Sequence, residues 1–201
     1  MKNKTVLGVA VIGMIALSAF TNKHLVVYNA DTKLSTLEWF AVKVTGKHNG
    51  VVNLSSGTIT NDHGNLSAVF EIDMTTIATK DLTGEYAAKL DKHLKSEDFF
   101  SAEKHPKAKF VSTSITPVKD AQPAANTHTV KGNLTIKDKT SEITFDAIIA
   151  GDAGKMTCIG TAIVDRSKYD VKYASKTFFP EIGDKMINDE FSLKFNVVAT
   201  K

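Results

Sequence analysis

Most of this chain alternates between apolar and polar residues, and this period of two constrains the fold more than any other feature. Between Leu66 and Met74 every second residue is apolar, with Phe70 and Ile72 at the centre. The intervening positions are polar except for Val69. Side chains of a strand point alternately to its two faces, so the pattern predicts a half-buried strand. Similar segments joined by short turns recur along the chain and predict eight or nine strands.

The number and order of these strands limit the fold class. Sequential antiparallel strands with short connections favour a closed barrel or a two-sheet sandwich. An eight-stranded barrel is wide enough to hold one small ligand, or to be filled by its own side chains. In the strand from Leu34 to Val44, alternation places Trp39 on one face and Phe40 on the other, and both faces are largely apolar. We therefore predict a barrel wall whose outer face is partly covered by a helix.

Residues 75–105 carry the one helical pattern in the chain. Leu82, Tyr86, Leu90 and Leu94 recur every four residues, which predicts a helix with a single apolar stripe. Such a helix is either a lid packed on a filled core or a lid over the mouth of a cavity. The sequence does not distinguish these two arrangements.

Residues 1–19 have the features of a signal peptide. Lys2 and Lys4 form a basic start, an apolar run follows from Val6 to Leu17, and small residues precede a cleavage site near Ala19. The run is shorter than the roughly 20 residues that span a bilayer, which makes a retained membrane anchor the weaker interpretation. We expect one mature domain, residues 20–201, in the periplasm or secreted.

Length and charge set further limits on function. The chain has 201 residues, which suits one domain with a sizeable core, and 42% of them are hydrophobic. The net charge is +3, and without Lys2 and Lys4 there are 23 basic residues against 22 acidic ones. Arg166 is the only arginine. We expect no nucleic-acid partner, because phosphate binding needs a clustered basic face.

No arrangement in the sequence points to catalysis or to a metal site. There is no Gly-x-Ser-x-Gly motif and no glycine-rich phosphate loop. Cys158 is the only cysteine and has strand-like neighbours, so we expect an inert buried thiol and no intrachain disulfide. The six histidines lack the short spacings of metal ligands, and the adjacent Glu97 and Asp98 point in different directions. We expect a protein that is not an enzyme, with no catalytic residue, metal or cofactor.

Five segments, taken in order, resemble the motifs of the YceI-like family. The central one has two adjacent phenylalanines followed by a proline and a new strand. Asp170 stands where the family motif has glycine. The resemblance covers nearly the whole chain after the leader. The matching segments are Ser35–Trp39, Asp91–Phe110, Gly132–Thr140, Asp165–Tyr173 and Ile182–Met186.

The resemblance implies an all-β fold, an extended eight-stranded antiparallel lipocalin-like barrel with one helical insertion and an apolar lumen. Members of the family hold isoprenoid chains, so the implied ligand is a polyisoprenoid lipid of the isoprenoid quinone or polyprenyl phosphate type. Its implied role is carriage or storage of that lipid in the cell envelope. A transient contact with a membrane surface and a homodimer are compatible with this role. The alternative is a non-catalytic envelope stress or interaction protein with a filled core, and an enzyme such as an esterase has the least support.

The residues expected to bind the lipid are large apolar side chains on the inward faces of strands and in the adjacent-phenylalanine segments. Burial of an isoprenoid tail needs no reactive group, since each CH₂ removed from water contributes about 0.8 kcal/mol. Asp165 and Arg166 are neighbours on a strand and face opposite sides, so structural pairing is expected for each rather than a headgroup contact. The predicted ligand-binding residues are Trp39, Phe70, Ile72, Phe99, Phe100, Phe110, Phe145 and Phe179.

Overall fold

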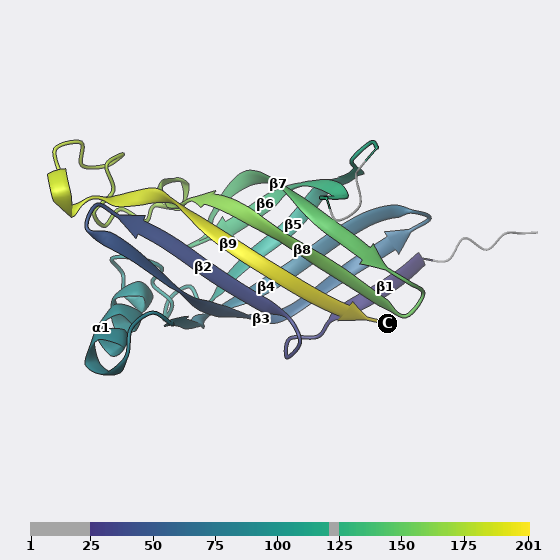
Figure 1. Ribbon diagram of the computed structural model, residues 1–201, viewed down its shortest axis with the longest axis horizontal. Coiled ribbons are helices and arrows are strands. Elements are labelled where there is room, and N and C mark those ends of the chain that lie inside the picture. The colour runs from purple at the N-terminus through teal and green to yellow at the C-terminus, as the bar shows by residue number, and fades with distance from the viewer. Residues whose placement is uncertain (1–24, 121–124) are drawn as a thin grey trace, which may run out of the picture.

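The computed structural model describes residues 25–120 and 125–201, which form one antiparallel β-sheet that closes on itself. The expected signal peptide lies outside the described residues. Figure 1 shows long strands that run obliquely along the molecule, with a helix at one end. The elements are β1 (Leu25–Ala30), β2 (Thr36–Lys43), β3 (Gly46–Asp62), β4 (Asn65–Thr79), α1 (Gly84–Lys95), β5 (Lys107–Pro117), β6 (His128–Ile136), β7 (Lys139–Gly151), β8 (Lys155–Asp165), the short 3₁₀ helices η1 (Arg166–Tyr169) and η2 (Gly183–Lys185), and β9 (Ile187–Thr200).

The strands from β2 to β9 form a closed ring of eight. Each strand pairs with the next in sequence, and β9 pairs with β2 to close the ring. This confirms the eight-stranded antiparallel barrel expected from the sequence. β1 is an additional strand that pairs with the ends of β3 and β9, and so extends the wall beyond the start of β2. The Tyr28 hydroxyl on β1 donates a hydrogen bond of 2.9 Å to the carbonyl of Asp152, which joins β1 to the β7–β8 turn.

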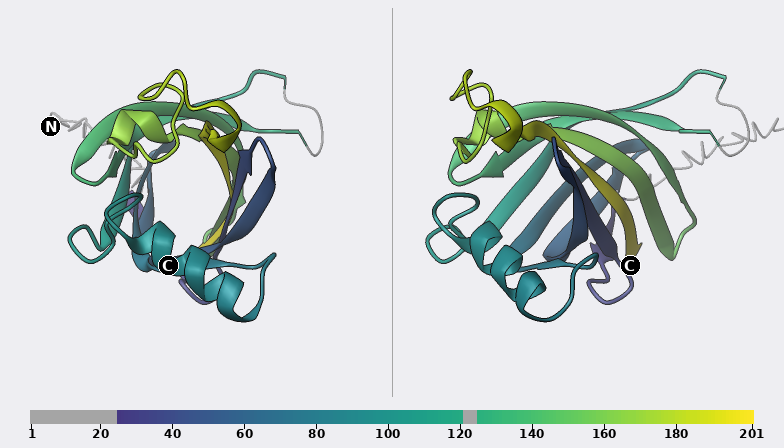
Figure 2. Two further views of the ribbon diagram at one scale, coloured as in Figure 1. Left: turned by 90° about the vertical axis from the view of Figure 1, so that its left-hand side faces the viewer. Right: turned by 60° about the vertical axis from the view of Figure 1, so that its left-hand side comes forward.

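The two ends of the barrel differ, and we name them the α1 end and the β1 end. The α1 end carries α1, the β2–β3 turn and the β8–β9 connection, residues 166–186. Figure 2 places α1 along one edge of this end and the β8–β9 connection along the opposite edge. The β1 end carries β1, the β3–β4 turn and the C-terminus. The helix and the longest connection between strands of the barrel's C-terminal half therefore lie at the same end.

The helix differs from the one that the apolar repeat predicted. β4 continues to Thr79, so α1 begins later and spans Gly84–Lys95. Leu94 is buried, Leu90 is half-buried, and Tyr86 is 74% exposed. The prediction of one continuous packed stripe is therefore wrong at Tyr86, because only the C-terminal half of α1 packs on the barrel. Among the described residues, no helix is long and apolar enough to cross a membrane.

The outer face of β2 is open to solvent. Phe40 is 41% exposed and Val42 49% exposed, and Val44 in the following turn is exposed as well. Leu37 and Trp39, on the opposite face of the strand, are buried, as alternation predicts. The expected cover of this outer face by a helix is wrong, because α1 packs mainly on β4.

Candidate ligand-binding site

Two cavities lie in series along the barrel and form the candidate site. The first, toward the β1 end, has a volume of about 70 Å³, and the second, toward the α1 end, about 90 Å³. Apolar side chains from the inward faces of the strands line both, and Arg166 and Asn188 are the polar residues at the second. The two linings share four aliphatic residues, which separate the cavities and which we call the waist. The waist residues are Ile72, Leu134, Val164 and Leu193.

Seven of the eight predicted ligand-binding residues lie in the walls of these cavities, and Phe179 does not. Phe179 is 50% exposed, in the β8–β9 connection. Its backbone N–H donates a hydrogen bond of 2.9 Å to the carbonyl of Ser175, in a turn that buries Ser175 and leaves Phe179 facing solvent. Its expected place in the lumen is therefore corrected, whereas lipid contact by the other residues stays a prediction. Those residues are Phe70, Phe110 and Phe145 at the first cavity, Ile72 at both, and Trp39, Phe99 and Phe100 at the second.

Glycines on neighbouring strands allow the aromatic side chains to pack against the barrel wall. A Cβ atom at Gly57 would lie 2.3 Å from a ring carbon of Phe70, closer than real side chains approach. Any larger residue at Gly57 would push the ring away from the wall. This close approach keeps large rings out of the space at the barrel centre. The same arrangement joins Gly50 with Trp39, Gly132 with Phe110, and Gly160 with Phe195.

The substitution Gly57→Ala is expected to lower the free energy of unfolding by about 1–3 kcal/mol, the usual cost of overpacking. The added methyl group meets the Phe70 ring and the carbonyl of Val69, which lies 3.1 Å from the ideal Cβ position. Urea denaturation followed by circular dichroism measures the change. Gly154→Ala is the matched control, because a Cβ there makes only an ordinary contact at 3.6 Å. Equal losses in the two variants would contradict the close-packing argument.

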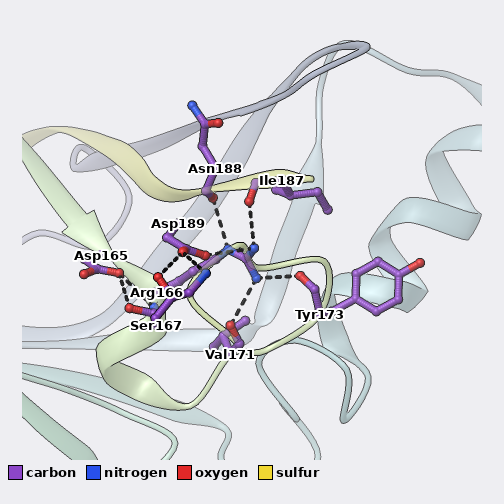
Figure 3. Close-up of polar contacts among 9 residues, drawn as sticks. Asp165, Arg166, Ser167, Val171, Tyr173, Ile187, Asn188 and Asp189 are labelled. Atoms are coloured by element: carbon purple, nitrogen blue, oxygen red, sulfur yellow. Dashed lines mark hydrogen bonds and ion pairs between the residues drawn. The ribbon is translucent and has the colours of Figure 1, made fainter. Parts of the chain in front are cut away.

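Arg166 places a buried positive charge at the α1 end of the second cavity. It follows directly after β8, and only 3% of its surface is exposed. Four guanidinium N–H groups donate to carbonyls in the β8–β9 connection or at the start of β9, and the Asp189 carboxylate forms an ion pair with the guanidinium, as Figure 3 shows. Arg166 therefore fastens this connection to the barrel, consistent with the structural role expected from the sequence. Its acceptors are the carbonyls of Asn188 (3.1 Å from Nε), Val171 (3.1 Å from Nη1), Tyr173 (2.8 Å from Nη1) and Ile187 (3.0 Å from Nη2). The carboxylate of Asp189 lies 3.3 Å from Nη2 and is its ion-pair partner.

Two carboxylates complete this clamp. Burial alone would raise the pKa of Asp189, but hydrogen bonds from the hydroxyl and backbone N–H of Thr177 and the charge of Arg166 together hold that pKa below its ordinary value. Asp189 therefore stays ionised beside Arg166 at neutral pH. Asp165 begins η1, and its carboxylate accepts hydrogen bonds from the backbone N–H and the hydroxyl of Ser167, at 3.0 and 2.6 Å. The side chain of Asp165 thus fixes the turn that delivers Arg166 to its acceptors.

The α1 segment, residues 80–106, is fastened to the barrel on both sides of the helix. Before the helix, Asp81 contacts His48 at 2.8 Å and accepts the backbone N–H of Asn49 at 3.0 Å. Partial burial alone would raise the pKa of Asp81, but the hydrogen bonds from Asn49, His48 and Thr79 lower it to about 2. After the helix, the ring of His105 lies 3.0 Å from the carboxylate of Asp138. These contacts hold the buried side chains of the segment in the wall of the second cavity.

Comparison with known families identifies the fold family. Residues 28–199 match the YceI-like domain. The chain belongs to this family. Among its relatives, a UPF0312 protein of Staphylococcus aureus (strain USA300) is 33% identical over 120 residues, which are 56% of this chain and 61% of the relative. A UPF0312 protein of Pseudomonas putida (strain KT2440) is 42% identical over 65 residues, 32% of this chain and 31% of the relative, so the matches span less than two thirds of these proteins.

Two solved structures share the YceI-like architecture. BcnA of Burkholderia cenocepacia matches with a TM-score of 0.65 and 23% identity, over 85% of this chain and 99% of BcnA. A polyisoprenoid binding domain from Saccharophagus degradans, implicated in plant cell wall breakdown, matches with a TM-score of 0.60 and 11% identity, over 86% of this chain and 97% of that domain. At these identities the likeness establishes the fold of this chain and not its ligand.

Cys158 lies in the wall of the first cavity of this YceI-like barrel. Burial raises the pKa of its thiol to about 12, so the thiol stays protonated at neutral pH and is a poor nucleophile. Within the described residues, no group of three or more His, Cys, Asp or Glu side chains is placed to hold a metal ion. Apart from Arg166 and Asn188 at the second cavity, the linings of both cavities are apolar.

Of the four waist residues, only Ile72 was among the predicted ligand-binding residues. Leu134, Val164 and Leu193 are aliphatic, whereas the prediction concentrated on aromatic side chains. The signal was present, since Leu134 alternates with Val130 and Ile136 on the buried face of β6. Selecting every second, inward-facing residue on each strand would have identified these residues, whereas selecting mainly aromatic side chains did not.

Proposed function

We propose that this YceI-like protein binds the tail of a polyisoprenoid lipid in its two cavities, and carries or stores that lipid in the cell envelope. The observation that carries this proposal is the pair of apolar cavities in series along a closed barrel. The structural neighbour described as a polyisoprenoid binding domain supports the same ligand class. The role is non-enzymatic, and the mature protein acts in the periplasm or outside the cell after removal of its leader.

Tail binding requires movement at the waist. A cavity of about 150 Å³ accommodates one benzene-sized molecule, and the two cavities here measure about 70 and 90 Å³. A tail of tens of carbons therefore displaces the four waist side chains and joins the two cavities. Aliphatic side chains change rotamer at modest cost. Burial of each CH₂ contributes about 0.8 kcal/mol, so a long tail offsets that cost.

One observation favours the second candidate function, a non-catalytic interaction protein with a filled barrel. Phe40 and Val42 on β2 and Ile163 on β8 expose apolar surface on neighbouring parts of the outer wall. Phe40 pairs with Ser192 on β9, and Ser192 pairs with Ile163, so Phe40 and Ile163 lie on either side of Ser192. Exposed apolar surface of this kind is typical of contact with another protein or a membrane.

Organic extraction of the gently purified mature protein, followed by mass spectrometry, tests the proposed function. We expect an isoprenoid lipid at close to one molecule per protein, either from the source cells or after incubation with total membrane lipids. Extraction of the same protein after denaturation and refolding without lipid is the control and should yield none. Absence of any extracted isoprenoid in both preparations of native protein would reject the carrier function and favour the interaction protein.

A further inference from the structure

An aromatic side chain occupies the lumen at the β1 end, beyond the first cavity. Figure 1 shows β1 at the end of the barrel opposite α1. Tyr28 on β1 is 3% exposed and pairs with Ile59, which lines the first cavity. Residues directly opposite each other on neighbouring strands point to the same face, so the Tyr28 side chain faces the inside of the barrel.

Small and flexible side chains continue this layer around the barrel. Ala30 on β1 pairs with Ala199 on β9, and Ala199 pairs with Met156 on β8. Ala199 and Met156 are buried. The Met156 sulfur lies 2.6 Å from the ideal Cβ position of Gly151, so this side chain packs closely on β7. We call Tyr28, Ala30, Met156 and Ala199 the base of the lumen.

The base lies one layer beyond the first cavity. Val197 on β9 and Cys158 on β8 line that cavity. Ala199 and Met156 lie two positions farther toward the β1 end on the same strands, and they are outside its lining. Alternate residues of a strand share a face, so these are successive inward positions. The free end of a tail that fills the first cavity therefore meets the base.

A hydrogen bond holds the Tyr28 side chain across the base. Its hydroxyl donates to the carbonyl of Asp152, in the turn between β7 and β8. β9 and β8 lie between β1 and β7 in the sheet, so the ring reaches past two strands of the wall. The carboxylate of Asp152 accepts the backbone N–H groups of Gly154 and Lys155, at 2.8 and 3.0 Å, and these hydrogen bonds lower its pKa. The ionised carboxylate therefore fixes the turn that holds Tyr28.

The base gives the lumen a definite depth. On β9, Ile187 lines the second cavity and Val197 lines the first, ten residues farther along the strand. At about 3.4 Å per residue and a strand tilt of about 40°, this separation is about 25 Å along the barrel axis. An isoprene unit adds four chain bonds of about 1.5 Å and advances by about 5 Å when extended. The lumen therefore holds a tail of about five isoprene units.

We propose that the base limits the length of the isoprenoid tail and that the Tyr28 ring sets this limit, so that the protein selects tails of about five isoprene units. This inference rests on the proposed function and specifies the tail. A longer tail leaves apolar carbon in water, and a shorter tail leaves part of the lumen without contacts, and both are unfavourable. The six-carbon ring of Tyr28 is comparable in size with one five-carbon isoprene unit.

Competition among polyprenols that differ only in tail length tests the limit. An equimolar mixture with three to eight isoprene units is supplied in detergent micelles, and native mass spectrometry identifies the bound lipids. For the wild-type protein we expect a maximum at about five units and at least about tenfold less of the eight-unit polyprenol. Tyr28→Val removes the ring and keeps an apolar residue that favours a strand, so we expect its maximum to shift by about one unit toward longer tails.

Two further variants make the Tyr28 result specific. Tyr28→Phe is the matched control, because it keeps the ring and loses only the hydrogen bond to Asp152, so we expect its maximum at the wild-type length. Met156→Ala enlarges another part of the base, and we expect it to shift the maximum toward longer tails as well. It provides the same test if Tyr28→Val does not fold, as judged by circular dichroism.

The outcomes separate the length limit from the proposed function. A flat distribution of tail lengths, or the same maximum in the wild type and in the folded base variants, would overturn the length limit and leave the carrier function standing. An equal shift in Tyr28→Phe and Tyr28→Val would overturn the assignment of the limit to the ring. Binding of no polyprenol by the wild-type protein would instead reject the carrier function.

Discussion

Arg166→Met is expected to lower the free energy of unfolding by about 3–5 kcal/mol, the usual cost of removing one partner from a buried ionic network. The methionine keeps part of the apolar stem but donates no hydrogen bond. Four carbonyls then lose their donor, and the Asp189 carboxylate loses its ion-pair partner, in a region where water reaches them poorly. Urea denaturation, followed by far-ultraviolet circular dichroism, measures the loss.

Two further variants make the Arg166 result specific. Arg166→Lys keeps the charge but offers three donors from one point, so it cannot reach acceptors spread around a planar guanidinium and should be intermediate in stability. It also provides a graded measurement if Arg166→Met does not fold. Lys172→Met is the matched control, because Lys172 is an exposed cation in an ion pair with Asp170, and little change is expected. Similar stabilities of Arg166→Met and Lys172→Met would refute the clamp.

The fold could be predicted because alternation and strand order act locally. A half-buried strand needs apolar residues at every second position, and this pattern is visible without knowledge of its partners. Closure into a barrel depends on pairing between β9 and β2, far apart in sequence, and the family resemblance supplied that expectation rather than periodicity. The same alternation predicted that Phe70 and Phe110 face the lumen, and both lie in the wall of the first cavity.

The incorrect predictions concern the α1 end, where tertiary contacts decide orientation. The four-residue repeat through Tyr86 predicted a packed helix face, but β4 continues farther and only the C-terminal half of α1 packs on the barrel. Phe179 was expected in the lumen because it is aromatic. The β8–β9 connection is held by Arg166 and Asp189, and neither partnership can be read from residue spacing. A sequence pattern indicates which residues favour burial, whereas tertiary contacts determine which of them are buried in the folded protein.

Ala162→Leu is expected to weaken binding of an isoprenoid tail by about 100-fold while leaving the fold intact. Ala162 is 4% exposed, lines the first cavity and pairs with the waist residue Leu193. The larger side chain occupies space of the first cavity, about 70 Å³, that the tail would otherwise fill. Exclusion of about four CH₂ groups at about 0.8 kcal/mol each removes about 3 kcal/mol, which corresponds to this loss.

The stability of Ala162→Leu separates a binding lumen from a structural core. Filling a cavity restores apolar contacts, and this gain offsets the strain of a larger side chain, so the free energy of unfolding should change by less than about 1.5 kcal/mol. Ala150→Leu is the matched control, since Ala150 is exposed on β7 and the same substitution there should leave binding unchanged. Titration with a polyisoprenoid lipid, followed by Trp39 fluorescence, gives the affinities. A stable Ala162→Leu protein that binds the tail as tightly as wild type would show that the first cavity is not where the tail lies.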